Sequence, residues 1–144
     1  MVYVAKIGGH RQAKSPSRPG GRMPVHCTAI GKILLAYSDA EVQQEVLSGP
    51  LERRTPHTVV APGLLERQLA TALESGVAFE REESAPGLQC IAAPILTDGG
   101  DRALAAVSIT GPVGRFRPEA HVTVVRAAAQ GLSSLVSRRR SLSR

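Results

Sequence analysis

Polar side chains that could bind a small molecule lie within one otherwise apolar stretch, residues 76–112. They are the carboxyl group of Glu80, the thiol of Cys90, and the hydroxyl groups of Ser108 and Thr110. Polar groups inside an apolar sheet must form hydrogen bonds, either with the protein or with something bound to it. The stretch therefore predicts a site for a small polar ligand.

The elements that would position these groups are three short strands, predicted at residues 77–82, 88–97 and 103–110. The turn sequences 84–87 and 98–101 separate them, as in an antiparallel meander. Residues two apart in a strand share a face, so Ser108 and Thr110 should lie together, and Glu80 should lie with Ala78 and Glu82. Strands this rich in Ala, Ile and Val are expected to be covered on both faces, one of them by helices.

A helix N-terminus is the second candidate feature. Thr28 is predicted to cap a helix over residues 29–37. The unpaired N–H groups and partial positive charge at such a start favour carboxylates. From these residues alone, an ordinary capped helix remains the favoured interpretation.

The rest of the chain gives the order β, α, α, α, β, β, β, α, which indicates an α+β fold with a largely antiparallel sheet. An edge strand is predicted at 2–7, followed by a basic loop at 8–23 that could either cover a ligand site or be a disordered connector. A capping box at 38–41 should begin a helix over 39–47, and a further helix is predicted to end at Ser75. The last helix should open at 116–119 and carry an apolar seam formed by Val122, Val125, Ala129, Leu132 and Val136.

Composition sets the broad class. The 144 residues are 42% hydrophobic and 21% charged, the balance of one soluble globular domain, with no apolar run long enough for a membrane span. No secretory signal is recognised at residues 1–10, so a cytoplasmic location is expected. The net charge of +6 comes from the two ends, and the basic residues 138–144 are expected to form a flexible tail rather than a nucleic-acid contact. Aromatic residues make up 3%, which argues against base-stacking modules.

Catalytic and metal sites are the weaker interpretations. Cys90 with His26 or His57 would give a nucleophile and a base, but no nucleophile elbow surrounds Cys90. His26, Cys27 and Cys90 lack metal-ligand spacing, so neither metal nor cofactor is predicted. The ring of His57 is expected to fix its own loop through hydrogen bonds, and Glu82 and Glu83 are expected to face solvent or to pair with arginines.

Five sequence blocks carry a resemblance to a known family. They are PVHCTAIGK (24–32), TPHT (55–58), GVAFEREE (76–83), GLQCIAAP (87–94) and SITGP (108–112). In this order and spacing they resemble the effector-binding domain of the IclR family of bacterial transcriptional regulators. The resemblance implies a GAF/PAS-like domain with a curved sheet flanked by helices.

The resemblance also implies a set of site residues. Backbone amides of Ala29 and Ile30 would hold the acid group of an effector, and Glu80, Cys90, Ser108 and Thr110 would contact the rest of it. The sequence departs from the family in two ways: Glu80 is longer than the usual aspartate, and Ala29-Ile30 is bulkier than small-residue variants. Both changes would reshape the pocket. A small hydroxy- or keto-acid is the implied ligand class, and the scarcity of aromatic residues favours an aliphatic one.

The function implied is that of a non-enzymatic ligand-sensing domain of an IclR-type regulator. The family's winged helix-turn-helix, its linker and the first elements of the domain are not recognised, so the domain is expected to be N-terminally incomplete. Operator DNA would be bound only through that missing part, and the domain itself should form dimers or tetramers. A stand-alone sensor or oligomerisation module, and a cysteine-dependent hydrolase, remain as alternatives.

Overall fold

A three-stranded antiparallel sheet forms the centre of the fold. The computed structural model describes residues 1–9, 13–97 and 100–142. The strands β1 (Ala78–Arg81), β2 (Leu88–Leu96) and β3 (Ala103–Pro112) are arranged in the order β1-β2-β3. The helices are α1 (Ala29–Ala36), α2 (Ala40–Ser48), α3 (Pro62–Ser75) and α4 (Val122–Leu142), with a 3-10 turn η1 (Pro118–His121) before α4. The predicted α+β class and its antiparallel sheet are confirmed.

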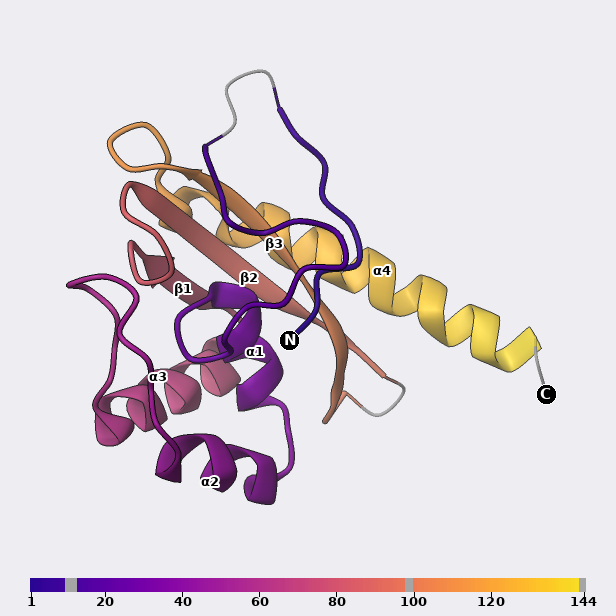
Figure 1. The fold of residues 1–144 in the computed structure, drawn as a ribbon. Helices are drawn as coiled ribbons and strands as arrows, with labels where there is room; N and C mark the ends of the chain where they lie inside the picture. Colours follow the sequence, from indigo (N-terminus) through magenta and orange to yellow (C-terminus); the bar gives the residue numbers. More distant parts are fainter. Residues whose placement is uncertain (10–12, 98–99, 143–144) are drawn as a thin grey trace.

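Helices cover both faces of the sheet (Figure 1). The central strand β2 is almost wholly buried, and its alternate residues enter two separate cores. Cys90 and Ala92 pack with α1 and α3 on one face, whereas Ile91 and Ala93 pack with α4 on the other. An almost continuous apolar run in a strand is the pattern expected when both faces are covered. Within the described residues, no helix is both long and apolar enough to cross a bilayer.

The predicted strand at residues 2–7 is wrong. Only an isolated bridge joins Val2 to Arg22, and the Tyr3 backbone exchanges hydrogen bonds with residues 20 and 21. Val4 and Ile7 are 88% and 98% exposed. The β-branched alternation was a genuine signal of extended backbone, but a strand needs a neighbour, and this segment pairs with its own loop and not with the sheet.

The N-terminus of α2 also differs from the prediction. The helix begins at Ala40, and its cap residue Asp39 makes no side-chain capping bond. The Ser38 hydroxyl donates instead to the carbonyl of Leu35 in α1 (2.7 Å). The expected capping box is therefore absent, because Ser38 closes the preceding helix.

The last helix, α4, extends well beyond the residues that it buries against the sheet. Val125 and Ala129 are buried against the sheet, whereas Leu132 is partly exposed and α4 continues past the sheet edge (Figure 1). Residues 138–142, predicted to belong to a tail, form the last turns of α4. Residues 10–12 of the predicted basic loop, 98–99 of the predicted turn and 143–144 of the tail lie outside the described residues.

The chain leaves β1 through an unusual residue. β1 ends at Arg81, and Glu82 has a φ of 55°, the left-handed region that non-glycine residues seldom adopt. Its carboxylate accepts the Gly87 N–H (2.9 Å) and so closes the turn to β2. The sequence predicted that Glu82 shares the strand face of Glu80. This prediction is wrong, because Glu82 lies in the turn after β1.

A buried ion pair ties this turn to α1. The Lys32 ammonium donates to both carboxylate oxygens of Glu83, at 2.6 and 2.7 Å, and to the Phe79 carbonyl at 3.2 Å. Both side chains are almost fully buried, so the expectation of an exposed or arginine-paired Glu83 is wrong. Removing one member of such a pair leaves an uncompensated charge in a low dielectric.

We expect Glu83→Gln to lower the free energy of unfolding by about 3–5 kcal/mol, because it leaves the Lys32 ammonium buried without a counter-charge. Urea denaturation followed by circular dichroism measures this. Glu119→Gln, which removes an exposed partner of Arg81, is the matched control and should change little. Equal midpoints for the two variants would contradict the structural role of the buried pair.

Candidate functional site

Three of the predicted site residues form one line across the sheet. Glu80 lies directly opposite Cys90, and Cys90 lies directly opposite Thr110. Cys90 belongs to the core beneath α1, so this polar row faces that helix. The Cys90 thiol and the Thr110 hydroxyl are hydrogen-bonded at 3.1 Å. The polar row thus runs from a buried carboxyl group on β1 to an exposed hydroxyl on β3.

Ser108 lies in the next row on the same face. Its cross-strand neighbour is Ala92, which in turn lies opposite Ala78. Ser108 is half-buried, and its hydroxyl forms no hydrogen bond with any other residue in the described ranges. A half-buried hydroxyl flanked by small side chains is well placed to bond something outside the chain.

The start of α1 has two amides free for an anion. The Thr28 hydroxyl accepts the Gly31 N–H (3.0 Å), and the Thr28 carbonyl accepts the Lys32 N–H (2.9 Å). The N–H groups of Ala29 and Ile30 have no acceptor among the residues that the structure describes. Ala29 belongs to the same packed cluster as Cys90. The predicted helix start is therefore on the face of the sheet that carries the polar row.

Gly31 allows this close packing. A Cβ at this position would lie 2.4 Å from the Val25 carbonyl oxygen and 2.6 Å from the Thr28 hydroxyl. Backbone atoms cannot yield to such a contact without moving the cap itself. The geometry of the α1 start thus requires glycine at position 31.

Burial dominates the chemistry of Glu80. Its side chain is 1% exposed, and its Oε1 accepts both the N–H and the hydroxyl of Ser84. Desolvation raises the pKa of this carboxyl above its ordinary value, although the bonds from Ser84 oppose the shift.

The thiols are poor nucleophiles. Burial, followed by the Glu80 charge, raises the pKa of Cys90, and the same two causes raise the pKa of Cys27 to about 11. Thiolate is the reactive form, so the raised pKa values leave less of either side chain in that form near neutral pH. His26 instead bonds the Glu52 carbonyl through Nε2 (2.9 Å). In the parts of the chain that are described, no group of three or more His, Cys, Asp or Glu could hold a metal ion.

The threonines of the loop at 55–58 hold it in place. The prediction that the ring of His57 does so is wrong. The Thr55 hydroxyl donates to the Glu82 carbonyl (2.6 Å), and the Thr58 hydroxyl donates to the Glu83 carbonyl (2.7 Å). The His57 side chain is exposed, and within the described part of the chain only its backbone N–H forms a hydrogen bond. The two threonines hold the turn that follows Glu80.

Sequence reasoning missed Tyr3. Its side chain is half-buried, and its pKa is raised by burial and then by the charges of Cys90, Glu80 and Cys27. The alternation in residues 2–7 indicates that one side of the segment faces inward, although taken alone it favours a strand at the sheet edge.

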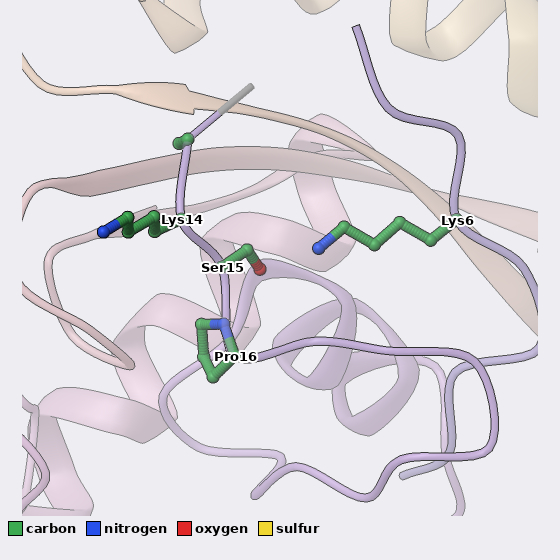
Figure 2. A pocket seen from close by; sticks show the side chains of 5 residues that line it. Lys6, Lys14, Ser15 and Pro16 are labelled. Atoms are coloured by element: carbon green, nitrogen blue, oxygen red, sulfur yellow. The ribbon is translucent and has the colours of Figure 1, made fainter. Parts of the chain in front are cut away.

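A cavity of about 610 Å³ opens beside this segment, lined by Lys6, Ala13, Lys14, Ser15 and Pro16. Figure 2 shows the side chains of Lys6 and Ser15 pointing toward one another, while Lys14 points to the side. Ala13 also packs against the core cluster that contains Ala29 and Cys90. The cavity thus adjoins the core cluster beneath α1, and Lys6 and Lys14 are among the residues that line it.

Fold and site together define a class: an α+β domain in which a helix N-terminus and polar side chains meet on one face of an antiparallel sheet. The family model described as the C-terminal part of the bacterial transcriptional regulator IclR matches residues 1–134. The chain therefore belongs to the IclR family, as its five sequence blocks indicated.

Three relatives illustrate the similarity. The HTH-type transcriptional regulator KdgR of Dickeya chrysanthemi is 36% identical over 137 residues, covering 92% of this chain and 45% of that protein. An IclR homolog of Microbacterium hydrocarbonoxydans, solved with 4-hydroxybenzoate, superposes with a TM-score of 0.83 at 35% identity, covering 89% of this chain and 52% of that one. The inducer-binding domain of PobR from Acinetobacter, a double mutant with 3-hydroxybenzoic acid, gives a TM-score of 0.77 at 29% identity, covering 88% and 75%. The chain spans about half the length of the curated relatives it matches.

We expect Gly31→Ala to destabilise the domain by about 1–3 kcal/mol, because the new methyl group overlaps the Val25 carbonyl and Thr28. Gly131→Ala, at an exposed position in α4 with open space around it, should instead stabilise by about 0.5–1 kcal/mol. Thermal unfolding of both variants measures the contrast. Similar shifts for the two would show that α1 does not depend on the glycine.

The pKa of Glu80 predicts a specific pH dependence. The native state binds the Glu80 proton more tightly than the unfolded state does. The resulting stabilisation of the native state is complete below the ordinary glutamate pKa of 4.5, and it is lost as the pH rises through the raised native pKa. The free energy of unfolding of the native chain should therefore fall, relative to Glu80→Gln, as pH increases above about 4.5. Urea titrations at several pH values measure this difference. If the free energy of unfolding changed with pH in the same way for the native chain and for Glu80→Gln, the raised pKa of Glu80 would be contradicted.

Proposed function

We propose that this chain is the ligand-sensing domain of an IclR-type transcriptional regulator and that it binds a small organic acid between the start of α1 and the polar row. One observation carries the proposal. The free amides of Ala29 and Ile30 and the polar groups of Glu80, Cys90 and Thr110 come from distant parts of the chain to one face of the sheet.

Each group has a distinct role in this account. The carboxylate of the ligand accepts the N–H groups of Ala29 and Ile30, where the helix dipole favours negative charge. The polar group at the other end of the ligand meets Glu80, whose pKa is raised by burial. Ser108 and Thr110 supply hydroxyls that can donate or accept. A neutral ligand would leave the helix start unsatisfied, so an acid fits best.

The charge around the cavity supports the same ligand class. Lys6 and Lys14 border it, and residues 1–32 contain six Lys or Arg and no acidic residue. A positive local potential raises the concentration and the association rate of small anions. Two structural relatives are described as complexes with hydroxybenzoates, which are also acids.

The same proposal covers the regulator as a whole. Effector binding would shift the equilibrium between arrangements of a dimer or tetramer, and so control how an N-terminal domain outside this chain binds operator DNA. The relatives are transcriptional regulators, and the raised pKa values of the thiols disfavour a hydrolase, so the domain is proposed to be a cytoplasmic, non-enzymatic sensor.

Thermal unfolding against pyruvate, lactate, malate and hydroxybenzoates tests this function. An acid that binds only the native state should stabilise it by about 2.7 kcal/mol at a hundredfold excess over its dissociation constant. Ser108→Ala should reduce this shift without altering the free protein, since the hydroxyl has no bond to lose in the described chain. Ser134→Ala, exposed on α4, is the matched control. A full shift in Ser108→Ala, and in Glu80→Ala if it folds, would place the ligand elsewhere.

A further inference from the structure

The cavity beside the first residues of the chain contains none of the groups that were assigned to hold the organic acid. It has a volume of about 610 Å³ and is lined by Lys6, Ala13, Lys14, Ser15 and Pro16. Cavities that bind small molecules commonly have volumes of this order. In Figure 2 the Lys6 side chain extends toward Ser15. The cavity thus lies between two arms of the chain, residue 6 on one side and residues 13–16 on the other.

The charge that lines this cavity is positive. Lys6 and Lys14 contribute two ammonium groups, and no acidic side chain is among the lining residues. Neither lysine takes part in any of the four ion pairs of the described ranges. No acidic residue precedes Asp39 in the sequence, so neither arm of the chain carries a carboxylate of its own. The two positive charges are therefore available to an anion from outside the chain.

Hydrogen-bond donors are also left over. The Lys6 ammonium donates to the Ser17 carbonyl (2.9 Å), which occupies one of its three N–H groups. Lys14 has no hydrogen-bond partner among the residues that the structure describes. The Ser15 and Ser17 hydroxyls are bonded to each other at 2.7 Å, and the Ser15 hydroxyl also accepts the Ser17 N–H (3.2 Å). These bonds fix one side of the cavity, while the lysines offer free donors to a group that accepts hydrogen bonds.

We propose that this cavity is an anion site separate from the polar row and that it binds a phosphate group, either free phosphate or the phosphate ester of a small metabolite. Two ammonium groups match the double negative charge of such a group, and lysine binds phosphate well as a point charge. The phosphate oxygens accept the N–H groups that Lys6 and Lys14 have free. The volume of the cavity leaves room for an organic remainder.

A bound phosphate would join the two arms of the chain. The bond from Lys6 to the Ser17 carbonyl already links them. Ala13 packs against the core cluster beneath α1, so the second arm is anchored to the domain. A phosphate in contact with both Lys6 and Lys14 would add a second link between residues 1–9 and that cluster. Phosphate should therefore stabilise the native state.

Isothermal titration calorimetry with inorganic phosphate and with glycerol 3-phosphate, at constant ionic strength, tests the site. We expect one phosphate group bound per chain. Lys6→Gln and Lys14→Gln should each weaken binding by about tenfold or more, because each removes a charged donor. Arg18→Gln is the matched control: it removes a positive charge at an exposed position of the same loop, outside the cavity lining, and should bind as the native chain does.

The two probes also identify the source of the phosphate group. Tighter binding of glycerol 3-phosphate would support a metabolite ester, and equal or tighter binding of inorganic phosphate would support the free ion. Both lysines and Arg18 are exposed, so the three variants should unfold at the native temperature when no ligand is present. An equal loss of affinity in Arg18→Gln and in the two lysine variants would overturn the inference, because it would show attraction to net charge and not a site.

Failure of this inference is distinguishable from failure of the proposed function. If neither phosphate bound to the native chain while an organic acid still did, the anion site would be overturned and the proposed function would stand. If phosphate bound and no organic acid did, the proposed function would fail and the anion site would stand. Phosphate binding should also survive in Ser108→Ala, whose hydroxyl belongs to the other site.

Discussion

The Lys32 ammonium lies between both carboxylate oxygens of Glu83 and the Phe79 carbonyl, out of contact with solvent. This arrangement joins the first turn of α1 to both ends of the short segment that contains Glu80. A buried charge tolerates little displacement from its partner. The start of α1 and the end of β1 are therefore held in a fixed position relative to each other. Thr55 and Thr58 reinforce it by binding the carbonyls of the same turn.

The candidate site follows from this constraint. Free amides occur at every helix start, and polar side chains occur in many sheets. Here the two meet on one face, because Gly31 lets α1 pack closely and the cross-strand register aligns Glu80 with Cys90 and Thr110. Burial raises the pKa of Glu80. In the proposed site, an organic acid would be bound by the helix start at one end and by the Glu80 carboxyl group and the hydroxyls at the other.

Local signals in the sequence were sufficient for most of this fold. Turn sequences and apolar runs predicted the three paired strands, and Thr28 predicted the start of α1. The errors arose where a partner is distant in sequence: the strand at 2–7 lacks a neighbour, and the partner of Glu83 is 51 residues away. Of the site, the helix start and the shared strand face could be predicted. The partial burial of Tyr3 could not, because it depends on how residues 1–3 pair with residues 20–23.

The central claim is that the α1 start and the polar row form a single binding site. Its most direct test is a 15N–1H NMR titration of the chain with the acid that raises its unfolding temperature most. The account predicts that the amide signals of Ala29, Ile30, Cys90 and Thr110 shift together and saturate at one ligand concentration. Shifts confined to α4, or saturation of the helix amides and the strand amides at different concentrations, would contradict it.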